Sequence, residues 1–314
     1  MSELVNPTLG IGTGLLKAAA KHPEMVVLAV DNRGAIVPGL NLYEHIPGRY
    51  FDVGIAEQNM VTTAAGFAAS GKIPFATGIG NFVALRCVEQ IRTFIAHTKL
   101  NVKIIGGITG LSAGKEGPTH EATEDIAHMR AIPDMVVLAP TDIVSAEKAV
   151  LAAAEWKGPV YISIGRTPSA VIYDDSYQFR IGSADLHRQG KDVTILSTGH
   201  MLAYVLEAAD RLAAEGVSAR VLDVQTIKPL DEEAVLAAAK ETGAIVTVEE
   251  HTIVGGLGGA VAEYLSGVYP APVVRVGIND EYSQTGTPEE LMVVHGLTPE
   301  NIVRSARRAM ELNR

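Results

Sequence analysis

Residues 135–166 read MVVLAPTDIVSAEKAVLAAAEWKGPVYISIGR, and this stretch sets the fold class. Two short runs, residues 135–138 and Val160–Ile164, are almost entirely apolar, and an Ala-rich segment with a helical pattern, Ile143–Glu155, separates them. Strands without polar alternation are buried on both faces, which is typical of parallel sheets covered by helices. The stretch therefore predicts two parallel strands joined by a crossover helix.

The same alternation extends towards both ends of the chain and predicts an α/β protein with mainly parallel sheets flanked by helices. Further strands are expected at residues 25–30, 73–76, 102–105, 193–197, 219–222, 245–248 and 273–276. Further helices are expected at residues 9–21, 57–70, 82–97, 122–131, 202–214, 231–242, 256–266 and 299–312. The polar stretch 171–191 has no clear period and interrupts the alternation. We therefore expect domains at 1–172 and 191–314, joined by a linker at 173–190.

Composition excludes several classes of protein. The chain has 314 residues, which suggests about two domains, and its 47% apolar content is enough to bury a core. The chain has 36 acidic and 26 basic residues, and this excess of negative charge disfavours nucleic-acid binding. No uncharged apolar run reaches the ~18 residues of a membrane span. The first residues do not show a basic region followed by an apolar core, so we do not expect a secretory signal. The single cysteine, Cys87, excludes an intrachain disulfide and a Cys-based zinc site, so we expect a reduced, cytoplasmic setting.

Two glycine patterns resemble nucleotide-binding loops. Gly10, Gly12 and Gly14 lie inside a helical run that follows no strand, so we interpret them as structural. The residues 255–259, GGLGG, do follow a strand and open a helix, where backbone N–H groups could hold an anion. Close packing of the helix on the sheet is the favoured interpretation of this second pattern.

The first candidate site residue is Glu57, which opens a helix whose next turns are almost wholly apolar. The helix dipole alone favours a Glu in the first turn. Apolar surroundings would favour the protonated carboxyl, which can donate a hydrogen bond. The residues alone leave both interpretations open.

The second candidate is the loop GKEGPTHE, residues 114–121, between an expected strand and an expected helix. Ligands of such folds bind in loops that follow the carboxyl ends of parallel strands. Glu116 and His120 make this loop a plausible polar site. A capped loop, with His120 bonded to the backbone, is the alternative.

Together these segments resemble the second half of transketolases, and in particular the enzymes that carry this half as a separate chain. The matching segments follow the family order: GIAEQNM (54–60), EQIRT (89–93), GKEGPTH (114–120), MRAIPDMVVLAPTD (129–142), ISIGR (162–166), TIKPLD (226–231) and VEEHTIVGGLGG (248–259). The resemblance implies a thiamine-diphosphate pyrimidine-binding domain followed by a transketolase C-terminal domain. It also implies transfer of a two-carbon ketol unit from a ketose to an aldose.

Functional residues are implied position by position. Glu57 matches the glutamate that hydrogen-bonds the N1′ atom of the cofactor's pyrimidine, and Phe82 matches the aromatic ring that stacks on it. Ile55 falls at a further cofactor-binding position. His120 matches the catalytic histidine that hydrogen-bonds the reacting end of the sugar. Glu57 and His120 are thus the expected catalytic residues.

The implied substrate site departs from the family pattern. Glu116 stands where the family usually has an Asp that contacts sugar hydroxyls, and Arg166 matches the arginine that meets the sugar's distal phosphate. Ile108 replaces a phosphate-binding histidine and Ala35 replaces a serine, while Ile79 stands at one of the two aromatic positions near the pyrimidine. An arginine of the first helix is also missing around residues 8–17. We therefore expect a sugar with a different distal end: unphosphorylated, branched or sulfonated.

The GDG…N segment, with which transketolases hold the diphosphate and its metal, is absent from this sequence. The resemblance therefore implies a partner, an N-terminal diphosphate-binding subunit that supplies the ligands of the diphosphate and of Mg²⁺ or Ca²⁺, in an α2β2 assembly. No metal ligand is assigned to this chain. The alternatives are a β-type subunit of a 2-oxo-acid dehydrogenase, a deoxyxylulose-phosphate synthase-like chain, and a non-catalytic regulatory subunit.

Overall fold

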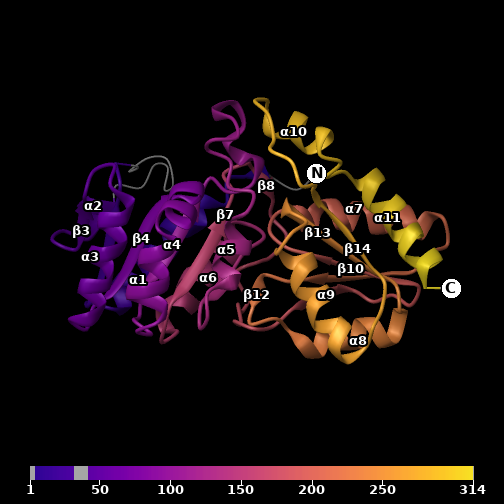
Figure 1. The fold of residues 1–314 in the computed structure, drawn as a ribbon, viewed down its shortest axis with the longest axis horizontal. Helices are drawn as coiled ribbons and strands as arrows, with labels where there is room; N and C mark the ends of the chain where they lie inside the picture. Colours follow the sequence, from indigo (N-terminus) through magenta and orange to yellow (C-terminus); the bar gives the residue numbers. More distant parts are fainter. Residues whose placement is uncertain (1–3, 32–41, 314) are drawn as a thin grey trace.

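The computed structural model describes residues 4–31 and 42–313. Two α/β domains lie side by side, the first in indigo to magenta and the second in orange to yellow (Figure 1). Each has a mainly parallel sheet with helices on both faces, as the sequence predicted. No helix among the described residues has the length and apolar character that a membrane span needs.

The first domain is built on a seven-stranded sheet with the order β12-β6-β7-β5-β4-β2-β3. All of its pairs are parallel except β12–β6. The strands are β2 (Met25–Ala29), β3 (Tyr50–Asp52), β4 (Ile73–Ile79), β5 (Lys103–Gly107), β6 (Val136–Leu138), β7 (Val160–Ile164) and β12 (Thr226–Lys228). One core cluster packs α1 (Thr8–Lys21) and α6 (Ile143–Glu155) on one face. The opposite face carries α3 (Glu57–Ala69), α4 (Val88–Gln90) and α5 (Asp125–Ala131), and the short α2 (Leu42–His45) precedes β3.

The glycines of α1 serve close helix packing. A Cβ atom at Gly10 would lie 2.0 Å from the carbonyl oxygen of Ile143, and one at Gly14 would lie 2.8 Å from Cβ of Val150. Both contacts are with α6, so any larger residue would push the two helices apart. The structural interpretation of this glycine pattern is confirmed.

The second domain has a five-stranded sheet with the order β14-β13-β10-β11-β9, in which only β9 is antiparallel to its neighbour. Its strands are β9 (Asp185–Arg188), β10 (Val193–Ser197), β11 (Ala219–Asp223), β13 (Ile245–Thr252) and β14 (Val273–Ile278). One face packs α7 (Met201–Ala214) and α11 (Pro299–Leu312), and the other packs α8 (Glu232–Thr242) and α9 (Leu257–Val268). The helix α10 (Pro288–Val294) lies near the top of the molecule in Figure 1.

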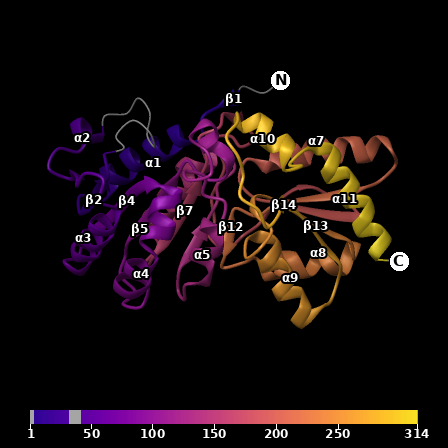
Figure 2. The same ribbon diagram turned by 45° about the horizontal axis from the view of Figure 1, so that its top comes forward.

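The two domains share structure at their boundary. The strand β12 follows β11 in the chain, yet it pairs with β6 of the first sheet. One core cluster runs from Met60 in α3 to Leu257 in α9. Near the N-terminus, β1 (Leu4–Val5) pairs with β8 (Ser169–Ala170) beside α10 and α7 (Figure 2). The segment expected as a linker contributes β9 to the second sheet.

The expected helix at 82–97 differs from a regular α-helix. It contains two π-helical segments, η1 (Phe82–Arg86) and η2 (Ile91–Ala96), on either side of α4. A π turn changes the hydrogen-bonding pattern without changing the apolar character of the sequence, so the periodicity does not reveal it. Such turns are frequent at functional sites.

Candidate active site

Glu57 is buried at the start of α3 and is 3% exposed. The turn before it is held by Asp52, whose Oδ1 accepts hydrogen bonds of 3.0 Å from the N–H groups of Asp31 and Gly54. Nη1 of Arg86 donates to Oε2 of Glu57 over 2.6 Å. The sequence suggested apolar surroundings for Glu57. The structure differs, because the guanidinium of Arg86 in η1 reaches the carboxylate.

Phe82 and Arg86 form the opposite wall of the same site. They lie four residues apart in η1, and Cζ of Arg86 stands 4.6 Å from the centre of the Phe82 ring. The main-chain carbonyl of Arg86 accepts a hydrogen bond of 3.1 Å from Nε2 of Gln58. The π turn thus places a ring and a planar cation together against a buried carboxylate.

His120 reaches the same ring from the loop after β5. Its ring centre lies 5.1 Å from that of Phe82, in an edge-to-face arrangement of 71°. Nδ2 of Asn81 donates to the carbonyl of Thr119 over 2.7 Å, which fixes the loop to the start of η1. The structure therefore brings together three of the predicted residues, Glu57, Phe82 and His120.

Glu116 and Arg166 form a second cluster. Nη2 of Arg166 donates to Oε1 of Glu116 over 2.8 Å and to the carbonyl of Ala113 over 3.1 Å, while its Nε donates to the carbonyl of Ser112 over 3.0 Å. Both residues line a pocket of about 390 Å³, to which Thr287, Pro288 and Glu289 of the second domain also contribute. Arg166 thus already has three acceptors of its own chain.

The remaining predicted positions lie in different settings. The Ile108 side chain is buried, at 1% exposed, and its φ of 58° is left-handed. Ile79 ends β4 and is half-buried, and Ile55 is 77% exposed. Ala35 falls outside the described residues.

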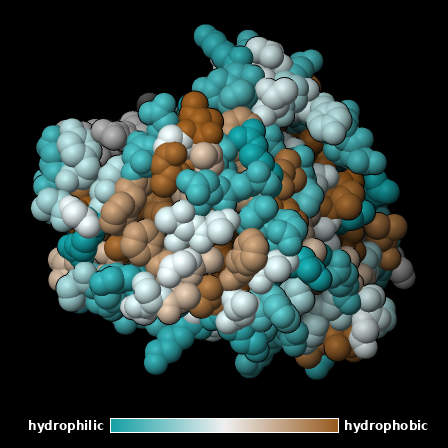
Figure 3. All heavy atoms as spheres, turned by 60° about the vertical axis from the view of Figure 1, so that its left-hand side comes forward, coloured by the Kyte–Doolittle hydropathy of each residue, from teal (hydrophilic) through white to brown (hydrophobic). Residues whose placement is uncertain are grey.

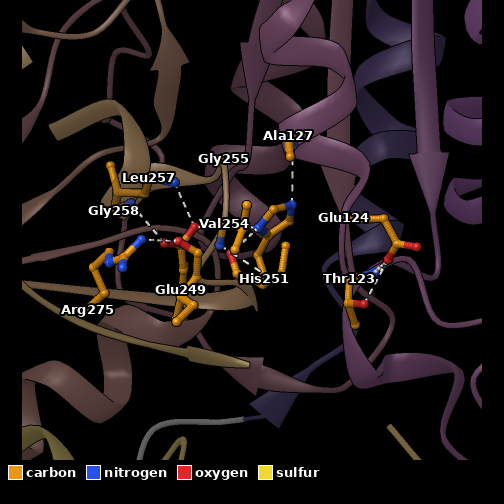
Figure 4. A network of polar contacts seen from close by, with 12 residues as sticks. Thr123, Glu124, Ala127, Glu249, His251, Val254, Gly255, Leu257, Gly258 and Arg275 are labelled. Carbon is orange, nitrogen blue, oxygen red and sulfur yellow. Dashed lines mark hydrogen bonds and ion pairs between the residues drawn. The ribbon is translucent and has the colours of Figure 1, made fainter. Parts of the chain in front are cut away.

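The glycine-rich turn before α9 binds the side chain of Glu249 from the same protein chain. Glu249 is fully buried and accepts hydrogen bonds from the N–H groups of Leu257, at 2.6 Å, and Gly258, at 2.8 Å (Figure 4). A Cβ atom at Gly256 would lie 2.0 Å from Oε2 of Glu249. Close packing therefore explains the glycines, and the helix N-terminus is already neutralised.

His251 joins this network to the first domain. Its Nε2 accepts a hydrogen bond of 3.3 Å from the N–H of Ala127 in α5, and its Nδ1 donates to the carbonyl of Thr252 over 2.7 Å. These two bonds fix one neutral tautomer of the imidazole.

Two buried carboxyls were not singled out from the sequence: Glu121, the last residue of the 114–121 loop, and Glu250 of β13. Glu121 is 3% exposed, and burial raises its pKa to about 7. Glu250 accepts from the N–H of Leu111 over 2.9 Å, and burial raises its pKa to about 8. The only sequence signals were the position of Glu121 directly after His120 and the presence of Glu250 in the 248–259 motif.

Comparison with known proteins assigns both domains. Residues 6–169 match the model for the transketolase pyrimidine binding domain, and residues 182–302 match that for the transketolase C-terminal domain. A putative transketolase C-terminal section from Methanocaldococcus jannaschii is 41% identical over 96% of this chain and 94% of its own length. A 6-deoxy-6-sulfo-D-fructose transketolase subunit from Clostridium sp. strain MSTE9 is 42% identical over 95% of this chain and 92% of its own length.

The solved structures agree with this assignment. A split-gene transketolase, described as an inactive β4 tetramer, superimposes with a TM-score of 0.90 at 40% identity, covering 99% of this chain and 100% of that one. A transketolase from Pichia stipitis shares the fold, with a TM-score of 0.80 at 18% identity over 99% of this chain and 46% of its own. This chain belongs to the transketolase family, as the pyrimidine-binding plus C-terminal chain of the split type.

Proposed function

We propose that this chain is the pyrimidine-binding subunit of a two-chain, thiamine-diphosphate-dependent transketolase, which transfers a two-carbon ketol unit from a ketose to an aldose. The observation that carries the proposal is the convergence of a buried carboxylate, an aromatic ring and a histidine, contributed by α3, η1 and the loop after β5. The family membership and the names of the relatives support this assignment.

The residues of the site fit an aminopyrimidine. Arg86, a planar group with N–H donors, already bonds Glu57 and covers the Phe82 ring, so the site accepts a flat nitrogen-bearing group. Thiamine diphosphate, when bound, supplies the electron sink for the reaction. Glu57 would hold the N1′ atom, Phe82 would support the ring, and His120 would hydrogen-bond the sugar. The partner chain would hold the diphosphate and Mg²⁺ or Ca²⁺.

The face that carries Glu57 is suited to a partner subunit. Ile55 is 77% exposed, Phe94 44% and Phe51 36%. Figure 3, turned so that the first-domain side of Figure 1 comes forward, shows apolar side chains among polar ones on this surface. We propose that the N-terminal, diphosphate-binding subunit covers this face in an α2β2 assembly, with Ile55 close to the cofactor.

The Glu116–Arg166 cluster supports a sugar with an unusual distal end. Two relatives are named for such sugars: the sulfofructose transketolase subunit, and an apulose-4-phosphate transketolase subunit from Phocaeicola vulgatus, which is 38% identical over 93% of this chain and 93% of its own length. Because the three acceptors of Arg166 leave only part of its guanidinium for a ligand, we infer that a dianionic phosphate binds weakly here.

Reconstitution tests the proposed function. The chain is combined with a transketolase N-terminal subunit, thiamine diphosphate and Mg²⁺, and transfer to ribose 5-phosphate is measured for phosphorylated, sulfonated and uncharged ketoses. We expect turnover only when both chains and the cofactor are present. Equal activity without the partner, or no transfer from any ketose, would contradict the proposal.

A further inference from the structure

Arg86 makes both of the contacts that the pyrimidine is proposed to make. Its Nη1 bonds the Glu57 carboxylate over 2.6 Å, and its Cζ lies 4.6 Å from the centre of the Phe82 ring. A guanidinium is flat, presents N–H donors in its plane and stacks on aromatic rings. An aminopyrimidine has the same flat shape and polar edge. The two groups therefore compete for one place.

The π turn explains how one side chain reaches both partners. Phe82 and Arg86 are the first and last residues of η1, and π-helical bonding brings residues four to five apart onto one face. The Phe82 ring and the Arg86 guanidinium then stack within the same short segment. The Glu57 carboxylate enters this pair from α3.

We propose that Arg86 occupies the pyrimidine subsite of the isolated subunit and is displaced when the cofactor binds, an inference that rests on the proposed function. Exposure makes the exchange feasible: the Arg86 side chain is 46% exposed, whereas that of Glu57 is 3% exposed. The arginine swings into solvent while the carboxyl stays in place. In the empty subunit, Arg86 spares Glu57 the cost of a buried and unpaired charge.

Displacement also releases Glu57 from its ion pair. The carboxylate oxygen that accepts from Arg86 over 2.6 Å then becomes available to the polar edge of the pyrimidine. Arg86 is therefore a positioning residue, because its departure frees the Glu57 carboxyl for the cofactor.

The test measures thiamine diphosphate affinity in the reconstituted two-chain complex by isothermal titration calorimetry with Mg²⁺. We expect Arg86→Ala to bind the cofactor about tenfold more tightly than the wild type. Arg86→Lys keeps the charge but not the flat stacking surface, so its Kd should lie between the two. Arg92→Ala, an exposed arginine on the neighbouring segment η2, is the matched control and should leave the Kd unchanged.

A second measurement uses the isolated subunit, without cofactor. Removing Arg86 leaves Glu57 buried without its partner, so Arg86→Ala should lower the melting temperature, and adding Glu57→Gln should restore it. Arg86→Gln, which keeps a donor, replaces Arg86→Ala in the affinity test if the alanine variant does not fold.

The two hypotheses fail differently. An unchanged or weakened cofactor affinity in the folded Arg86 variants, with a wild type that binds normally, overturns the displacement of Arg86 and leaves the proposed function standing. A wild-type complex that binds no thiamine diphosphate overturns the proposed function, and the inference with it.

Discussion

Glu57 shows how much a single residue can reveal and what it conceals. Its position at the start of an apolar helix identified it as a candidate from the sequence, and the structure buries it as expected. Its partner Arg86 was not predicted, because the two are 29 residues apart and meet only through the packing of η1 on α3. Because Arg86 is charged, the surroundings of the Glu57 carboxyl are polar where the sequence suggested apolar ones.

Replacing Glu57 with Gln tests the proton function of the carboxyl. The amide keeps the shape but cannot exchange a proton with a ring nitrogen, so we expect at least a hundredfold loss of kcat in the reconstituted complex. Cofactor affinity should change much less. Glu232→Gln is the control, because Glu232 holds the same first position in α8 but is exposed. Near-normal turnover in the Glu57 variant would leave only the helix-dipole interpretation.

Glu116 is expected to set the preference for the distal end of the sugar. Its carboxylate accepts from Arg166 over 2.8 Å, so an incoming phosphate has to compete with it. A charged hydrogen bond contributes about 1.5–3 kcal/mol. We expect Glu116→Gln to raise kcat/KM for xylulose 5-phosphate relative to an uncharged ketose by roughly tenfold.

The control for that comparison is Glu289→Gln, which changes a carboxylate in the lining of the same pocket but not the partner of Arg166. A wild type that clearly prefers the pentose phosphate, and loses that preference in Arg166→Ala, would show that one arginine suffices.

At the scale of the elements, prediction succeeded where local pattern and structure coincide. The βαβ unit formed by β6, α6 and β7 was predicted closely. In this unit the apolar periodicity, the capping residue of the helix and the burial of the strands all indicate the same elements. The strand β12 was not predicted, since three residues gain their pairing only from β6 of the other domain. The π turns were also missed, because their register depends on what Phe82 and Arg86 contact.

Lys228 tests the contribution of β12 to domain docking. Its Nζ donates to the carbonyls of Arg130 over 2.9 Å and Ile132 over 2.6 Å, both at the end of α5. Lys228→Met leaves these acceptors without their donor, so we expect a loss of about 1–3 kcal/mol in the free energy of unfolding. Urea unfolding measures it, with Lys240→Met, exposed on α8, as the control. Equal free energies of unfolding for the Lys228 and Lys240 variants would show that Lys228 contributes nothing to domain docking.

At the scale of the whole molecule, a buried acid links both domains and the segment between them. Asp223 of β11 accepts from Thr141 over 2.6 Å and from Tyr173 over 2.8 Å. Burial raises the pKa of Asp223 to about 8, with further contributions from the charges of Asp185 and Asp142. The carboxyl of Asp223 therefore connects the two domains by hydrogen bonds, and folding favours its protonated form.

Stability should fall as the pH rises. Between pH 4 and 8 the folded chain keeps a proton on Asp223 that the unfolded chain, with a pKa near its usual value of 3.8, has already lost. Raising the pH across this window therefore favours unfolding. Asp223→Asn cannot ionise, so its urea midpoint should decline less between pH 5.5 and 8 than that of the wild type. Asp280→Asn, which is exposed, should follow the wild type.

The final prediction concerns assembly. The chain carries the groups proposed to bind the pyrimidine, and Ile55, two residues before Glu57, is 77% exposed. A charge at the centre of an apolar interface remains unpaired and is costly to bury.

We expect Ile55→Asp to keep the melting temperature of the isolated chain, because Ile55 is 77% exposed, and to weaken association with the diphosphate-binding subunit more than tenfold. Leu312→Asp, 58% exposed at the end of α11, is the matched control. Analytical ultracentrifugation of mixtures should show two copies of each chain for the wild type and the control, and separate chains for the Ile55 variant. An intact α2β2 particle formed by the Ile55→Asp variant would place the partner on another face and leave Glu57 out of reach of a shared cofactor.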